Sequence, residues 1–249
     1  MRFGFTLFIC FIHFMGWNQS YKYAHHPLPK SYHNYENHDY AHFGTGISIP
    51  TGDFSGAPSG EGFQGFADIG WNLKTALGFQ INEQYEFEIE MKYTRNPVND
   101  QKMIAYAQEI TGENIISAST SNWNTTSLLI GPSAVYAEGN FFFRFLAKAS
   151  VNGVALPEIE MIYNNSSTEG KIKQNGGQAF GFGYNLGASI GFRPIEKLGI
   201  SLNYDYAHTR VHYDRIVLDY KNGVNTKIEF PQTVSISNFS LNLIFYFKN

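Results

Sequence analysis

The chain has 249 residues, a formal net charge of −3, and 16% aromatic against 16% charged residues. This length fits one β-barrel domain. The weakly acidic balance argues against a nucleic-acid-binding protein, which would carry a basic patch or stripe.

The N-terminus predicts a targeting segment. Met1 and Arg2 precede an apolar run from Phe3 to Trp17, which is too short for a helix that stays in a bilayer. We interpret residues 1–20 as a secretory signal peptide, with cleavage between 20 and 24. Cys10, the only cysteine, lies inside it, so we expect neither a disulfide nor a lipid anchor in the mature chain. If that chain lives in a membrane, it must cross as a closed barrel.

Residues 21–41 are polar and rich in histidine, with Pro27 and Pro29 among them. This composition predicts an extended or disordered periplasmic leader. Histidine is a common metal ligand, so weak metal binding is the alternative. The spacing of the histidines matches no closed site, and we predict neither a metal site nor a cofactor.

An alternation of apolar and polar residues predicts eight strands. In the clearest, Leu198, Ile200 and Leu202 face one side, while Ser201 and Asn203 face the other. The expected strands cover residues 42–52, 63–81, 85–95, 123–136, 141–154, 178–193, 198–214 and a last strand that ends near residue 247.

Short and long connections alternate between these strands. Residues 82–84, 137–140 and 194–197 are short links, whereas 53–62, 96–122 and 155–177 are long. Gln101–Ile110 could form one or two helical turns. Asn222-Gly223 is the strongest short-range hairpin signal and predicts the turn of a protruding β-ribbon. In the last strand the apolar parity changes between Ile236 and Phe239, which predicts a β-bulge near Ser237 and Asn238.

Volume indicates which face points inward. The lumen of an eight-stranded barrel is just wide enough for side chains to fill. The apolar face offers several Phe, Tyr or Leu per strand and suits the outer circumference, and the Gly, Ser and Asn face suits the lumen. A soluble lipocalin-like barrel with an apolar interior is the alternative. The connection lengths favour an all-β, eight-stranded antiparallel up-and-down transmembrane β-barrel in the cell outer membrane, over residues 42–249, with long extracellular loops and both termini periplasmic.

Three features carry a family resemblance: the segment Ile49–Phe54, the Gly-aromatic alternation of residues 180–192, and the Phe-rich last strand. With them the chain resembles the small outer-membrane β-barrel proteins of Gram-negative bacteria, of the OmpA membrane-domain and OmpX kind, over residues 41–249. The resemblance implies contact with outer-membrane lipid and lipopolysaccharide and assembly by the barrel-assembly machinery. The last aromatic residue, Phe247, is followed by Lys248 and Asn249, whereas the assembly signal of this family usually ends on the aromatic residue itself.

Charged residues on the inward parity are the first candidate site. We expect a lumen charge network of Lys74, Glu86, Glu88, Glu90, Arg144 and Lys148. One interpretation is a structural plug, in which losing one partner leaves a costly buried charge. The other is a narrow ion path or gate. The plug is favoured because eight strands rarely leave an aqueous channel.

His208, Arg210 and His212 share the outward parity beyond Tyr204 and Tyr206. Cations at this height could meet lipopolysaccharide phosphates; the alternative is a solvated ribbon face. The His-x-Ser motif of the lipid A deacylases is absent, because the residue two positions after His208 is Arg210. The sequence does not exclude a Ser-His-acid triad assembled from distant strands, because such triads are recognised by their geometry.

We therefore predict a non-enzymatic surface or structural protein whose loops and ribbon contact lipopolysaccharide or an extracellular protein. A small ion-conducting pore is the alternative, and a lipid A-modifying enzyme comes third.

Overall fold

The structure, a computed structural model, describes residues 38–56, 65–165, 168–220 and 225–248. Within these ranges, the side chains of residues 165, 168–169, 214–220, 225–228 and 248 are not described. The predicted signal peptide, most of the predicted leader and the predicted turn at Asn222 and Gly223 lie outside the described residues.

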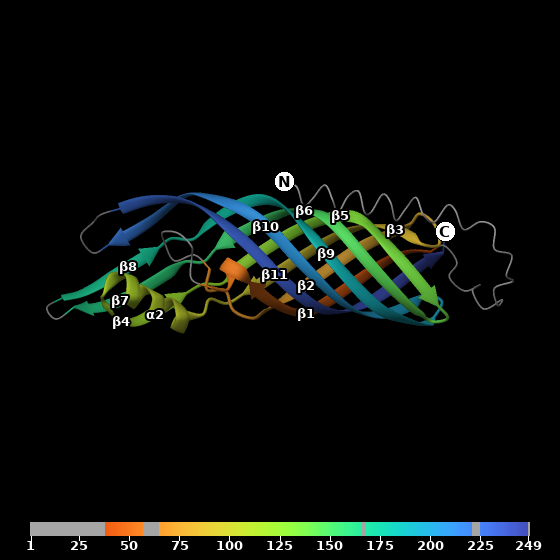
Figure 1. The fold of residues 1–249 in the computed structure, drawn as a ribbon, viewed down its shortest axis with the longest axis horizontal. Helices are drawn as coiled ribbons and strands as arrows, with labels where there is room; N and C mark the ends of the chain where they lie inside the picture. Colours follow the sequence, from red (N-terminus) through yellow and green to blue (C-terminus); the bar gives the residue numbers. More distant parts are fainter. Residues whose placement is uncertain (1–37, 57–64, 166–167, 221–224, 249) are drawn as a thin grey trace. The chain divides into compact units, whose positions relative to one another are not determined.

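Eight antiparallel strands close into a ring, and the predicted fold class is confirmed (Figure 1). Each strand pairs with its neighbours in the ring, and β10 pairs with β11 to close it. The connections Ile81–Gln84, Gly139–Asn140 and Glu196–Lys197 lie at one end, here named the turn end. In ring order the strands are β1 (His38–Thr51), β2 (Gly70–Gln80), β3 (Tyr85–Asn96), β5 (Trp123–Glu138), β6 (Phe141–Leu156), β9 (Gly177–Ile195), β10 (Leu198–Tyr220) and β11 (Asn225–Lys248).

The strand register gives the tilt of the barrel. A path that steps from each strand to the paired residue of the next leaves β6 at Gly153 and returns to β6 ten residues away, at Phe143. The shear number is therefore ten, which for eight strands corresponds to a tilt of about 40° from the barrel axis. The path runs through Gly153, Thr126, Tyr93, Leu73, Thr45, Leu241, Leu202, Ile190 and Phe143.

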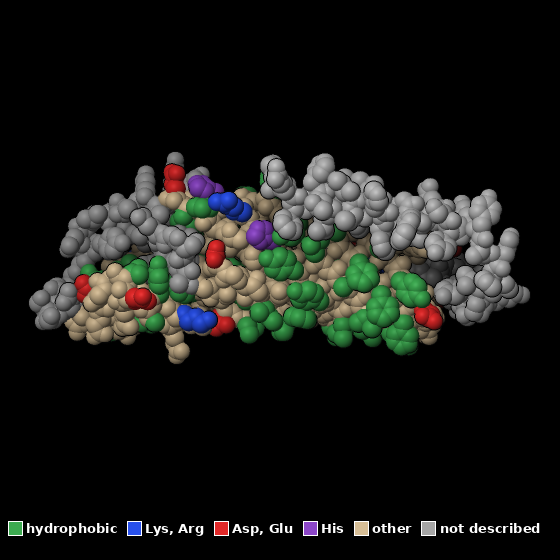
Figure 2. All heavy atoms as spheres, viewed as in Figure 1, with side chains coloured by type: hydrophobic (Ala, Val, Ile, Leu, Met, Phe, Trp, Pro, Cys, Tyr) green, Lys and Arg blue, Asp and Glu red, His purple; other side chains and the backbone are tan. Residues whose placement is uncertain are grey.

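An apolar band surrounds the ring. With this tilt, one residue along a strand advances about 2.5 Å along the axis and one strand along the path descends about 3 Å. Outward apolar side chains then fill a band about 25 Å tall, from Phe141 and Phe247 up to Trp71 and Tyr184, which is the height seen in outer-membrane barrels. Figure 2 shows part of this apolar surface in green. Phe145 is 63% exposed, so the large apolar residues face outward as predicted.

Beyond the other end of the ring, the long connections fold into an extension (Figure 1). It contains the 3-10 turn η2 (Gly52–Phe54), helix α2 (Asp100–Thr111) and strands β4 (Asn114–Thr120), β7 (Ile159–Asn165) and β8 (Thr168–Gln174). β8 pairs with the far part of β10, and the sheet continues through β7 to β4. The predicted helix is confirmed and is longer than expected, whereas the three strands were not predicted. Among the described residues, no helix combines the length and hydropathy needed to span a bilayer.

The extension has its own hydrophobic core. Trp123 is 1% exposed; its indole N–H donates to the carbonyl of Gly65 over 3.0 Å, and its ring packs edge-on against Phe54 at 5.2 Å. Other members of this core come from α2, from the sheet of the extension and from the ends of the barrel strands, including Met103, Ile115, Met161, Ile172, Val211, Tyr213, Phe230, Val234 and Ile236.

The predicted β-bulge near Ser237 and Asn238 is wrong. β11 pairs with β1 and with β10 through this point without a shift in register. Val234 and Ile236 are buried on the same inward face as Asn238, while Phe239 faces outward. They are apolar because the interior changes from the polar lumen to the extension core. The apolar residues therefore change face while the strand stays regular.

Two strand boundaries also differ from the prediction. β1 begins at His38, four residues before the expected start, so the end of the expected leader belongs to the barrel. β2 begins at Gly70 rather than at Phe63, because Phe66 and Ala67 are buried in the extension core instead of continuing the strand.

Candidate functional site

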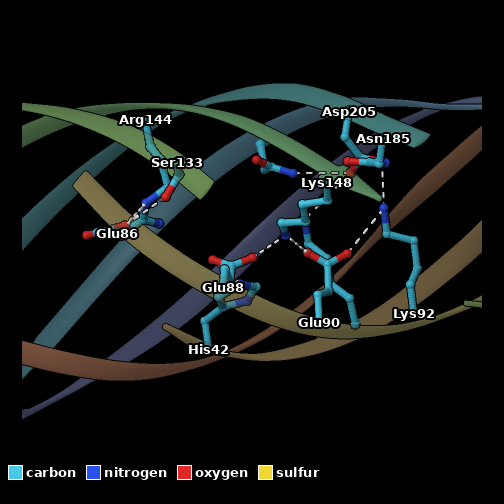
Figure 3. A network of polar contacts seen from close by, with 12 residues as sticks. His42, Glu86, Glu88, Glu90, Lys92, Ser133, Arg144, Lys148, Asn185 and Asp205 are labelled. Atoms are coloured by element: carbon cyan, nitrogen blue, oxygen red, sulfur yellow. Dashed lines mark hydrogen bonds and ion pairs between the residues drawn. The ribbon is translucent and has the colours of Figure 1, made fainter. Parts of the chain in front are cut away.

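The charged side chains of the barrel interior meet in one lumen network (Figure 3). Lys74, Glu86, Glu88, Glu90, Arg144 and Lys148 are all 3% exposed or less. They come from β2, β3 and β6, whose inward positions alternate with the outward apolar residues. Lys92 and Asp205 join them, so the network holds four cations and four carboxylates: Lys74, Lys92, Arg144, Lys148, Glu86, Glu88, Glu90 and Asp205.

Lys148 is the centre of the network. Its ammonium group contacts the carboxylates of both Glu88 and Glu90, at 2.6 Å from Glu90 Oε2. Lys92 lies 3.3 Å from the other oxygen of Glu90. The side chain of Lys148 is wholly buried, so water does not replace either contact. Lys148 on β6 therefore bridges Glu88 and Glu90, two successive inward residues of β3.

Arg144 forms the part of the network nearest the turn end. Its Nε lies 2.7 Å from Glu86 Oε2, and its guanidinium lies 4.6 Å from the centre of the Tyr40 ring. The Tyr40 hydroxyl donates to Glu88 over 2.7 Å and to Glu86 over 3.0 Å. Ser133 donates to Glu86 as well, over 3.2 Å. The buried carboxylate of Glu86 therefore has both an ionic partner and hydrogen bonds, which offset the cost of removing its charge from water.

Asp205 forms the part nearest the extension. Its Oδ1 accepts from Lys92 over 2.6 Å and from Asn185 over 2.7 Å, and its Oδ2 lies 3.7 Å from Lys74. Asn238 also donates to Oδ1, over 3.0 Å. Asp205 thus connects the polar faces of β2, β3, β9, β10 and β11.

Sequence reasoning missed four members of this cluster: Tyr40, His42, Lys92 and Asp205. Lys92 and Asp205 stand on the inward parity of predicted strands, so the alternation was sufficient to place them. His42 has the same parity as Gly44, and its Nε2 lies 3.4 Å from Glu88. Tyr40 could not be found, because the first strand was expected to begin after it.

One subset of the network has the composition of a metal site. His42, Glu88 and Glu90 offer donor atoms within 4.8 Å of one another. The ammonium group of Lys148 already lies on both carboxylates, and the four cations of the network balance its four carboxylates. These residues therefore fit an internal charge network better than a divalent cation.

Apolar layers close the lumen on both sides of the network. Toward the turn end, buried apolar side chains form the turn-end layer of Tyr40, Val135, Phe142, Ile244 and Tyr246. Toward the extension, a cavity of about 20 Å³ separates the network from the extension core, room for roughly one water molecule. The extension core follows beyond it. Within the described part of the chain, side chains thus fill the lumen as expected for eight strands.

The outward basic residues of β10, His208, Arg210 and His212, lie at the upper edge of the apolar band. His208 is half-buried; its Nδ1 lies 2.9 Å from Ser235 Oγ, and its ring stacks on Tyr184 at 5.2 Å. Arg210 and His212 are exposed. Figure 2 shows histidine and cationic side chains where the apolar surface ends. Among the described residues, no carboxylate is hydrogen-bonded to His208, so this Ser–His pair lacks the acid of a catalytic triad.

This architecture is that of the small eight-stranded outer-membrane β-barrels. No family model matches the chain, and no curated protein matches it in sequence. Solved structures of outer-membrane barrels are similar to it. Ail, the attachment invasion locus protein of Yersinia pestis, is 13% identical, with 85% of this chain and 99% of that chain covered and a TM-score of 0.42.

A major outer membrane protein from Thermus thermophilus is 9% identical, with 84% of this chain and 98% of that chain covered and a TM-score of 0.45. Neisserial surface protein A is 11% identical, with 84% and 97% covered and a TM-score of 0.39. The eight-stranded antiparallel ring agrees with the architecture that the predicted resemblance implies.

Proposed function

We propose that this protein is a non-enzymatic, non-conducting outer-membrane surface protein that uses its barrel as a scaffold and its extension as a binding surface. The observation that carries the proposal is the contrast between the two parts. Side chains fill the lumen, whereas the long connections are built into a folded structure with its own core. A protein whose loops only joined strands would not need such a core.

The filled lumen also argues against the pore alternative. Ions would have to pass the turn-end layer, the paired charges around Lys148 and the extension core in succession. Breaking a buried ion pair by removing one partner costs about 3–5 kcal/mol. A continuous water path through this interior would require several such contacts to open together.

We place the turn end in the periplasm and the extension outside the cell, following the usual arrangement of short turns and long loops. In this orientation the basic residues of β10 lie at the outer leaflet. His208, Arg210 and His212 then contact lipopolysaccharide, and the extension contacts an extracellular partner. Arginine suits this role because its planar guanidinium binds phosphate in a bidentate way.

Surface labelling tests the orientation. Cys10 is the only native cysteine and lies in the predicted signal peptide, so single cysteines can be introduced without interference. A membrane-impermeant maleimide should label Ser119→Cys, on exposed β4, in intact cells, and should label Glu83→Cys, at the turn end, only after the cells are lysed. Labelling in the reverse order would overturn the proposal.

A further inference from the structure

We propose that the outer wall formed by β9, β10, β11 and β1 binds one lipopolysaccharide molecule, with a phosphate on Arg210 and an acyl chain in a groove below it. This inference rests on the proposed function, because it requires the barrel to lie in the outer membrane with its extension outside. It adds an acyl-chain site and a single location on the barrel wall.

The acyl-chain site is an apolar groove of about 560 Å³ on the outside of the barrel. It lies between two adjacent rows of outward side chains that cross the strands in register. Leu202 and Leu241 pair in one row, and Tyr204 and Phe239 pair in the next. Ala188 and Thr45 also line the groove and leave room within the rows because they are small. The rows climb about 3 Å per strand, so the groove runs obliquely through the apolar band.

Polar atoms continue upward from the groove along β10 and β11. The Tyr204 hydroxyl lies 3.4 Å from Ser237 Oγ, and His208 Nδ1 lies 2.9 Å from Ser235 Oγ. Both pairs are on outward positions at the upper part of the band. This wall therefore changes from apolar to hydrogen-bonding at the depth where an acyl chain joins its headgroup.

Arg210 provides the charge above these polar pairs. It is exposed and lies about 5 Å further along the axis than His208, within the headgroup layer of a bilayer. The hydroxyl of Thr209 on β10 donates to the carbonyl of Phe182 on β9 over 3.1 Å, so Phe182 lies on the strand next to Arg210. The Phe182 side chain is 82% exposed and provides an apolar ring beside the guanidinium group on the outer wall.

The height of the wall favours lipopolysaccharide over a phospholipid. His212 continues the outward line of β10, about 10 Å above the band, and Phe180 is 77% exposed on β9. A phospholipid headgroup layer is only about 5–7 Å thick. The wall thus offers imidazole and aromatic contacts beyond the reach of a phospholipid phosphate, as a lipid with a large phosphorylated sugar headgroup requires.

Lipid that co-purifies with the full chain tests the inference. Outer membranes are extracted in mild detergent, the barrel is purified, and mass spectrometry measures how many lipopolysaccharide and phospholipid molecules it retains. Arg210→Gln removes the phosphate contact, and Ala188→Trp fills the groove. Arg95→Gln is the matched charge control, because Arg95 is exposed at a similar height four strands away. Thr75→Trp is the matched control for bulk, at a similar depth on β2.

The wild-type barrel and both controls should retain lipopolysaccharide, while Arg210→Gln should retain about fivefold less, as expected for one cation near a membrane surface. Ala188→Trp should show a similar loss. Retention of phospholipid instead, equal losses in the variants and their controls, or no retained lipid would overturn the inference. The labelling of Ser119→Cys is measured on the same cells. If it succeeds without retained lipopolysaccharide, this inference and the proposed lipopolysaccharide contact fail, while the proposed orientation and the role of the extension as a binding surface stand.

Discussion

Replacing Lys148 with methionine tests whether the lumen network is a closed structural plug. Lys148 is the wholly buried contact of both Glu88 and Glu90. In the Lys148→Met variant, four carboxylates face three cations. Removing one partner of a buried ion pair costs about 3–5 kcal/mol. Glu88 keeps the Tyr40 hydroxyl and Glu90 keeps Lys92, so we expect the lower end, about 3 kcal/mol.

Urea unfolding of the barrel in lipid vesicles, followed by tryptophan fluorescence, measures this loss. Lys171→Met is the matched control, since the Lys171–Glu160 pair is 2.7 Å long but its lysine side chain is 52% exposed. An exposed pair of this kind contributes about 0–1 kcal/mol.

The double variant Glu88→Gln, Lys148→Met separates charge from packing. It removes one carboxylate together with one cation, and replacing a buried pair is often close to neutral. We expect it to unfold within about 1 kcal/mol of the wild type. A loss below about 1 kcal/mol in Lys148→Met, equal to that of the Lys171 control, would refute the reasoning, because it would mean that water reaches these charges.

Three further predictions concern the extension and the turn-end layer. Trp123→Ala should lower the free energy of unfolding of the extension by about 3–5 kcal/mol. Limited proteolysis should then cut residues 100–120, while the barrel keeps its heat-modifiable migration. An unchanged digestion pattern would contradict the role of Trp123 in the extension core. Burial raises the pKa of Tyr213, whose hydroxyl donates to the Val154 carbonyl over 3.2 Å. Because a tyrosine hydroxyl in the unfolded chain ionises near pH 10, the contribution of Tyr213 to the free energy of unfolding should fall above about pH 10 and be unchanged below it. Between about pH 9 and pH 11, the free energy of unfolding should therefore fall less in Tyr213→Phe than in the wild type. An equal fall in both proteins would contradict the burial of the Tyr213 hydroxyl. In Gly191→Ala, the new methyl group would lie 2.0 Å from the Phe142 ring, so urea unfolding should show a loss of about 1–3 kcal/mol; wild-type stability would contradict the packing of the layer.

The barrel could be predicted from the sequence because one rule holds in its membrane part. Every strand there has a lipid side and a lumen side, so alternation alone places Leu202 outward and Asn203 inward. The same rule placed Lys74, Glu86 and Lys148 on the lumen face. It could not say which of them form pairs, because the pairing depends on the register between β3 and β6, which are not neighbours in the ring.

The rule fails where the strands leave the band. Val234 and Ile236 are apolar because they face the extension core, and their pattern imitates a β-bulge. The strands β4, β7 and β8 were missed for a related reason. β4 has only one buried residue, Ile115, since its sheet is covered on one face and pairs on one edge. Each of these strands has only seven residues, which is too short for a clear periodic signal.

Conductance through the purified barrel in a planar lipid bilayer tests the central claim, that the lumen is closed and function lies on the outer surface. Heat-modifiable, correctly folded protein should insert without producing discrete conductance steps, because the turn-end layer, the lumen network and the extension core interrupt any water path. Reproducible steps that grow with salt concentration and change in the Lys148→Met variant would contradict the claim and establish a pore through the network.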